Sequence, residues 1–145
     1  SVNRLSGVFT TTSRSESFCS LINQIKLYTK KGDRIFAYPS ISMVYFASEA
    51  LPFANHSWID LLDFEALHKK LQEFSEENFP VLVIKSKTNT SDYRWGGVRL
   101  NRKSCQEAED MEKKIEIIDQ VVHCKWKLTL VWSNLDFDVF LTSRH

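Results

Sequence analysis

The stretch Tyr93-Arg94-Trp95-Gly96-Gly97 combines a guanidinium group, two aromatic rings and two glycines. An arginine can hold a phosphate or carboxylate through two parallel hydrogen bonds, and an exposed aromatic ring can stack on a sugar. Residues 85–103 around it are rich in lysine and arginine. Arg94 and Trp95 are therefore candidate ligand-binding residues. The alternative interpretation is structural, with the rings covering the core and the basic residues forming a solvated surface.

A second candidate lies at the end of the short apolar run 34–38, which Pro39 closes. Such a run is typical of a buried strand, and ligands of α/β sheets bind outside the carboxyl ends of the strands. Tyr38 would lie at that edge. Ser40 is predicted to cap the following helix, whose N-terminus would attract an anionic group. Ser86 and Thr88, after the next central strand, are expected at the same edge.

The remaining titratable residues indicate neither catalysis nor a metal site. None of the four histidines has a second ligand at metal spacing, and the cysteines form no CxxC pair. Asp33, Asp60 and Asp63 would be the only paired acids for glycoside chemistry, but Asp33 is typical of a turn and Asp63 of a helix cap. No GxSxG, P-loop or GxGxxG pattern occurs. No catalytic residue, metal or cofactor is therefore predicted.

The composition is that of one packed domain spanning residues 1–145. The chain has 145 residues, 43% of them hydrophobic, and a formal net charge of +1, so no global field favours nucleic acid. Three cysteines, Cys19, Cys105 and Cys124, leave their pairing open, and Cys19 and Cys124 fall near apolar helical positions. No stretch reaches the roughly 18 apolar residues of a membrane span.

Hydrophobic periodicity predicts alternating strands and helices. A helix capped by Ser15 or Ser17 is expected to end at Gly32 and to turn one apolar stripe toward the core, formed by Phe18, Leu21, Ile22, Ile25 and Tyr28. Further helices are predicted after Ser40, after Asp63, where His68 falls in the apolar stripe, and after the capping box 104–107. Strands are expected at 5–11, 34–38, 55–61, 81–84, 126–132 and 137–141, the last two as a hairpin. This order predicts an α/β fold: a three-layer α/β/α sandwich with a mixed, mostly parallel sheet and a C-terminal antiparallel hairpin.

Several of these segments resemble a known family. Gly7-Val8-Phe9, the helix 18–29, Lys31-Gly32-Asp33-Arg34-Ile35-Phe36-Ala37-Tyr38-Pro39 and Tyr45-Phe46 look like the C-terminal soluble domain of polytopic membrane glycosyltransferases. These are the dolichyl-phosphate-mannose protein mannosyltransferases and the aminoarabinose transferase-like enzymes. The ending from Trp132-Ser133-Asn134 to Phe137 is similar to bacterial members. The resemblance covers about the first 50 residues and the last 15.

The resemblance implies an accessory extracytoplasmic domain, on the periplasmic face of a bacterial membrane, of an enzyme that uses lipid-linked sugar. The family's catalytic acid lies near its first membrane helices, so none is carried over to this chain. The implied partners are membrane helices of the same polypeptide and a lipid-linked sugar or acceptor. Two other hypotheses remain: a free-standing binding module for a phosphorylated or sugar ligand, and a small cytoplasmic enzyme of unknown chemistry.

Overall fold

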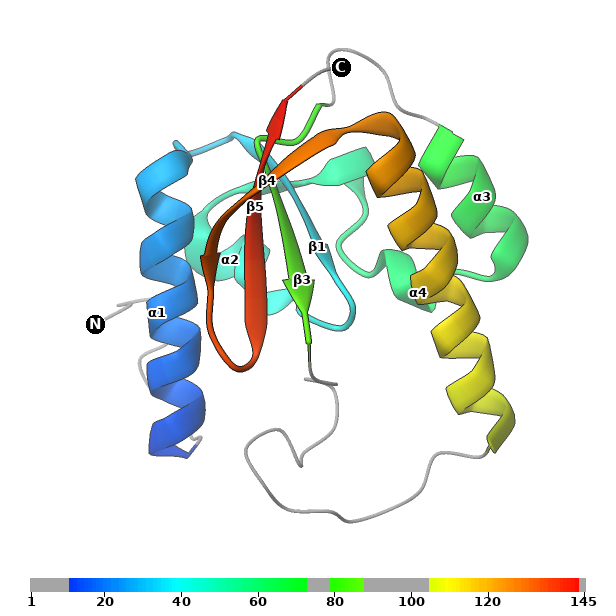
Figure 1. Ribbon diagram of the computed structural model, residues 1–145, viewed down its shortest axis with the longest axis horizontal. Helices are drawn as coiled ribbons and strands as arrows, with labels where there is room; N and C mark the ends of the chain where they lie inside the picture. Colours follow the sequence, from blue (N-terminus) through cyan, green and yellow to red (C-terminus); the bar gives the residue numbers. More distant parts are fainter. Residues whose placement is uncertain (1–10, 73–78, 88–104, 144–145) are drawn as a thin grey trace.

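A five-stranded sheet in the order β2-β1-β3-β5-β4 organises the computed structural model, which describes residues 11–72, 79–87 and 105–143 (Figure 1). For residues 105–108 it describes the backbone alone. The strands are β1 (Arg34–Tyr38), β2 (Leu51–Pro52), β3 (Leu82–Ser86), β4 (Lys127–Ser133) and β5 (Phe137–Ser143). β1 pairs in parallel with β2 and β3, whereas β5 pairs antiparallel with β3 and β4.

The mixed α/β class and the C-terminal hairpin are thus confirmed. The expectation of a mostly parallel sheet is wrong for the described residues, because two of their four strand pairings, β3 with β5 and β4 with β5, are antiparallel.

Helices pack against both faces of the sheet. The α-helices in the described part of the chain are α1 (Thr12–Tyr28), α2 (Met43–Ser48), α3 (Phe64–Gln72) and α4 (Cys105–Lys125). One core cluster joins α1 and α2 to side chains such as Ile84, and the other joins α3 and α4 to side chains such as Val83. Val83 and Ile84 are neighbours in β3 that point to opposite faces, and both are fully buried. The run 81–84 therefore has no polar face because helices cover β3 on both sides.

The start of α1 differs from the expected one. Thr11, and neither Ser15 nor Ser17, is the N-cap, and its hydroxyl oxygen accepts a hydrogen bond from the Arg14 N–H at 3.4 Å. The first helical turn is polar and solvent-exposed, so the apolar stripe that marks the helix begins later than the helix itself. At the other end the C-cap is Thr29, and Gly32 lies in the turn that follows, with a φ of 89°.

Residues 55–61 do not form the expected strand. Two short 3-10 helices, η2 (Phe53–Asn55) and η3 (Ile59–Leu61), take their place. The backbone reverses at Ala54 and Asn55, which have φ values of 52° and 54°, and this left-handed conformation cannot continue an extended chain. Ser40 caps no helix either, because α2 begins at Met43 after Ser42.

The predicted helix cap at Asp63 and the predicted burial of several helix residues can be compared directly with the structure. Asp63 does cap α3, since its Oδ1 accepts the Ala66 N–H at 2.7 Å. Tyr28, His68 and Cys124, assigned to apolar positions, are instead exposed, and Cys19 is half-buried. Cys19 and Cys124 are free thiols. The expected strand at 5–11 falls almost wholly, and the capping-box side chains wholly, outside the described residues.

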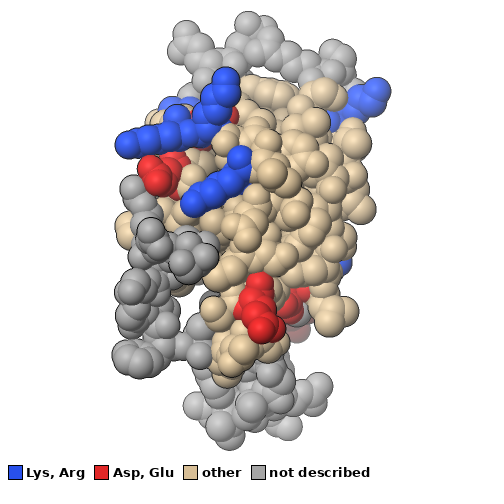
Figure 2. Space-filling model, turned by 90° about the vertical axis from the view of Figure 1, so that its left-hand side faces the viewer, with Lys and Arg blue, Asp and Glu red and all other residues tan. Residues whose placement is uncertain are grey.

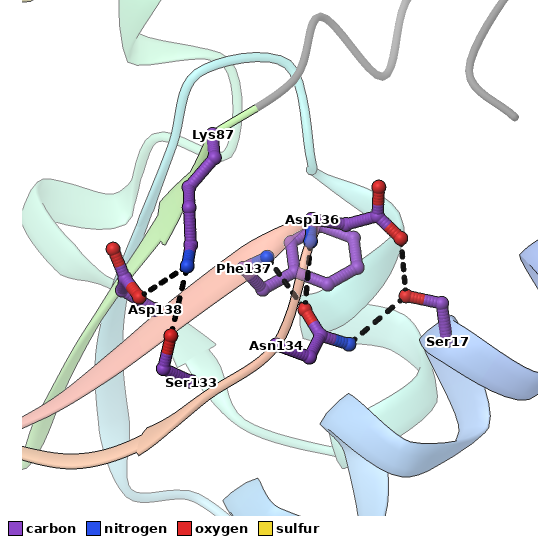
Figure 3. Close-up of polar contacts among 7 residues, drawn as sticks. All are labelled: Ser17, Lys87, Ser133, Asn134, Asp136, Phe137 and Asp138. Atoms are coloured by element: carbon purple, nitrogen blue, oxygen red, sulfur yellow. Dashed lines mark hydrogen bonds and ion pairs between the residues drawn. The ribbon is translucent and has the colours of Figure 1, made fainter. Parts of the chain in front are cut away.

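The turn between β4 and β5 is held against α1 by a polar cluster (Figure 3). Asn134 Oδ1 accepts the N–H groups of Asp136 and Phe137, at 2.9 and 2.7 Å. The Asn134 side-chain amide donates to the Ser17 hydroxyl oxygen at 3.1 Å, and that hydroxyl donates to Asp136 Oδ2 at 2.6 Å. Asn134 thus closes the hairpin, and Asn134 and Asp136 together anchor it to the helix.

Charge is unevenly spread over the side of the molecule that α1 occupies. Figure 2 shows a broad uncharged surface there, with Lys and Arg side chains gathered toward its upper end. α1 itself ends at that upper end, and Lys26 lies in its last turn. Acidic side chains lie beside this basic group and also at the lower end of the same surface (Figure 2).

Burial of β3 on both faces predicts the effect of a charge there. Val83→Asp should unfold the domain, because an unpaired buried carboxylate costs several kcal/mol against a total stability of about 5–15 kcal/mol. Leu27→Asp is the matched control, since Leu27 is 72% exposed, and it should change the free energy of unfolding by less than about 1 kcal/mol. Urea denaturation followed by circular dichroism measures both. A cooperatively folded Val83→Asp variant would contradict the two-sided core.

Candidate functional site

The carboxyl ends of β1 and β3 form a topological switch point. These strands are parallel neighbours, with Tyr38 opposite Lys85 at their ends. The chain leaves β1 toward α2 on one face of the sheet, and the next described helix after β3, α4, packs on the other face. In open α/β sheets, ligands bind outside the carboxyl ends of neighbouring parallel strands whose connections diverge in this way. Both strand ends lie at the lower edge of the sheet in Figure 1.

Buried polar groups concentrate at this edge. Among the described residues three polar or charged side chains are buried, Ser48, Asp60 and Ser86, and the last two lie here. Asp60 Oδ2 accepts the N–H of Ser40 at 3.0 Å and the hydroxyl of Ser40 at 3.1 Å. Ser40 has a φ of 55°, which turns its N–H and side chain toward the same oxygen. η3 is thereby fastened to the end of β1.

Tyr38, Lys85 and Asp119 form the second polar group of the edge. Asp119, on α4, accepts the Tyr38 hydroxyl at Oδ1 and the Lys85 ammonium at Oδ2, each at 2.7 Å. The side chains of Lys85 and Asp119 are 32% and 26% exposed, so solvent reaches this ion pair. Burial, and then the hydrogen bond to Asp119, raise the pKa of Tyr38 far above its usual value.

A second ion pair extends this row of charges from the end of β3 to β5. Lys87 Nζ lies 2.9 Å from Asp138 Oδ1 and donates to the Ser133 hydroxyl oxygen at 2.8 Å (Figure 3). Asp138 is the register partner of Lys85. Acidic and basic groups therefore alternate from α4 across β3 to β5. Such a row presents both donors and acceptors to a hydroxyl-rich ligand.

The structure brings two of the four predicted site residues to this edge. Tyr38 is buried, and its hydroxyl is engaged by Asp119. Ser40 binds the Asp60 carboxylate, which occupies the position where an anionic ligand was expected. The helix-capping argument for Ser40 fails, although Ser40 itself lies at the expected edge. Arg94 and Trp95 lie outside the described residues, as does Thr88.

Asp60, Lys85 and Asp119 organise the edge. Sequence reasoning missed Asp119, and it considered Asp60 only as a possible paired acid and Lys85 only as part of a basic stretch. Two of them carry a detectable signal. Asp119 directly follows Ile118 in the apolar stripe of α4, and Lys85 directly follows the apolar run 81–84. A charged residue at such a position needs a partner from another element. Asp60 carries no comparable signal, because its burial depends on the unexpected turn at Ser40.

No protein-family model, curated protein or solved structure matches the chain. Within residues 11–72, 79–87 and 105–143, no three His, Cys, Asp or Glu side chains gather to hold a metal ion. No helix in that part of the chain has the length and apolar character needed to cross a membrane.

The buried tyrosines predict a fall in stability at alkaline pH. Burial raises the pKa of Tyr38 and of Tyr45 well above the ordinary value of about 10. The unfolded chain therefore loses these protons first, so the free energy of unfolding declines as the pH rises above about 10. Each tyrosine contributes a slope of about 1.4 kcal/mol per pH unit.

Urea titrations between pH 8 and pH 11 measure this slope, and Tyr38→Phe should remove its share. An identical slope in the wild type and in Tyr38→Phe would show that Tyr38 is not protected in the folded state.

Proposed function

We propose that this chain is an accessory domain of a membrane-bound glycosyltransferase that uses lipid-linked sugar, located on the extracytoplasmic face. One observation supports the proposal: two described parts of the resembling motif, the strand Arg34–Tyr38 and the helix that carries Tyr45-Phe46, are bonded to each other at the switch point. The Tyr45 hydroxyl accepts the Ala37 N–H at 2.9 Å and donates to the Ala37 carbonyl at 3.3 Å. These bonds join the apolar strand of the motif to its Tyr-Phe helix.

The proposed domain has the three-layer α/β/α architecture that its periodicity predicts. Helix packing on both faces supports this assignment. In the intact enzyme the domain would shape the acceptor side of the active site and would supply no catalytic residue. The carboxylate of Asp119 and the ammonium of Lys85 are the solvent-reached groups that would contact sugar hydroxyls.

A free-standing binding module for a sugar or phosphorylated ligand is the second candidate. The alternating charges of Lys85, Asp119, Lys87 and Asp138 favour it, because they lie at the switch point and are reached by solvent. The two candidates differ in what the chain does alone. A module binds its ligand as the 145-residue chain, whereas the accessory domain needs membrane helices of the same polypeptide to complete the site.

Membranes containing the whole gene product test the first candidate. We expect transfer from a lipid-linked sugar, loss of transfer when the segment corresponding to this chain is deleted, and no transfer by the 145-residue chain alone. Quantitation of the glycosylated acceptor measures all three. The proposal fails if no membrane helices belong to the gene product, or if the isolated chain turns over a sugar substrate and a point change within it abolishes that turnover.

Arg94 provides a residue-level test in the same assay. Arg94→Ala should lower transfer at least tenfold, because a bidentate charge for a phosphate or carboxylate is lost. Its melting temperature should stay within about 2 °C of the wild type. Arg102→Ala is the matched control, a basic residue of the same stretch outside the aromatic motif, and should keep full activity. A loss of more than about 2 kcal/mol of stability in Arg94→Ala would instead mark the motif as a structural cover.

A further inference from the structure

β4 is the strand at one end of the sheet, next to β5 (Figure 1). Among the described residues it pairs with β5 alone, and it is 7 residues long, whereas β2 at the other end of the sheet has 2. An edge strand presents a row of backbone N–H and C=O groups to any chain that can lie beside it. Charged side chains along an edge strand usually oppose such pairing, but the one charged residue of β4 is Lys127 at its start.

The first part of β4 is regular and exposed to solvent. Residues Lys127 to Leu130 follow the β5 ladder one by one, and the register shifts between Leu130 and Trp132. Lys127, Thr129 and Leu130 are exposed, and Leu130 keeps 55% of its surface in solvent. This part of the strand therefore offers a regular backbone edge together with an exposed apolar side chain.

The side chains of β4 alternate between the two faces of the sheet. Leu128 packs against the core cluster of α3 and α4, as does Phe140, the register partner of Leu130. Alternation turns Leu130 to this same face. Thr129 and Val131 lie on the other face, where Val131 packs against the cluster of α1 and α2. An apolar strip therefore runs from β5 to β4 on the α3–α4 face.

We propose that a second copy of this chain pairs with the edge of β4, its own β4 running antiparallel, around a two-fold axis at Thr129. In this register Thr129 lies opposite the partner's Thr129. Leu130 lies opposite the partner's Leu128, and Val131 lies opposite the partner's Lys127. The inference stands on the edge strand alone and does not rest on the glycosyltransferase proposal.

The strand is complementary to itself in this register. A two-fold axis perpendicular to the sheet keeps each face on its own side, so opposing residues must come from the same face, as Leu128 and Leu130 do. The leucines of the two copies then continue the apolar strip across the junction and cover Leu130. The two Lys127 side chains lie at opposite ends of the paired segment, so no like charges face each other.

The register shift in β4 excludes the neighbouring alternative. Pairing around Leu130 would place Leu128 opposite Trp132, and Trp132 packs against the α1 and α2 cluster on the other face. The self-pairing also uses each β4 edge once, so the assembly closes at two copies. A contact of one short strand pair belongs to the smallest interfaces, which predicts a dissociation constant of about 10 μM to 1 mM.

Sedimentation equilibrium of the 145-residue chain tests the inference. The wild type should pass from monomer to dimer as its concentration rises through this range. Leu130→Ser should weaken the dimer at least tenfold, because it removes the apolar contact across the junction. Leu27→Ser is the matched control, since Leu27 is a leucine on α1 that is 72% exposed, and this variant should dimerise as the wild type does.

Charges placed at the axis test the register itself. Thr129→Lys and Thr129→Glu should each be monomeric, because like charges would lie directly opposite each other. An equimolar mixture of the two variants should form a heterodimer, since opposite charges then meet at the axis. Thr129 is exposed, so both variants should fold, and far-ultraviolet circular dichroism checks this before mixing. The inference is overturned if the wild type stays monomeric, as it would when something else occupies the edge, if it forms larger assemblies, or if mixing does not restore association.

Discussion

The parallel pairing of β1 with β3 is the constraint on which the rest of the structure depends. Four consecutive residues of β1, from Ile35 to Tyr38, are buried, as are Leu82, Val83 and Ile84 in β3. Strands that are apolar on two faces need cover on both, and parallel strands need crossover connections to provide it. α2 and α3 arise from this requirement, and α1 and α4 complete the two clusters. The diverging connections then create the switch point.

Asp119 shows how the same pairing determines local chemistry. The pleat that sends Phe36 into the second core cluster also sends Tyr38, the last residue of the strand, to that face. A phenol at the rim of a core needs a hydrogen-bond partner, and Asp119 supplies it from α4. Lys85 neutralises the carboxylate from the neighbouring strand. One polar group thus ties a helix to both central strands, and it does so where solvent enters.

Local patterns predicted the elements that depend on a few neighbouring residues. The buried strands, the Asp63 cap and the hairpin were all found in this way, because periodicity and turn chemistry act over short distances. The strand expected at 55–61 was wrong because apolar alternation there is overridden by a distant contact, that of Asp60 with Ser40. The candidate site could be predicted only in part for the same reason, because its contacts join residues that are distant in the sequence. Tyr38 and Ser40 were placed at the correct edge, but their actual partners, Asp119 and Asp60, lie 81 and 20 residues away in the sequence.

The turn at Ser40 connects the polar and apolar parts of the lower edge. Its N–H and hydroxyl satisfy a carboxylate that would otherwise be buried without a partner, which is why η3 stays folded against the end of β1. The same contact holds Asp60 inside and leaves Trp58 and Leu61, on either side of it, exposed. The burial of this carboxylate therefore depends on a turn 20 residues away in the sequence. The edge rests on two carboxylates, Asp60 in η3 and Asp119 on α4, because each one satisfies polar groups at or just after the end of β1.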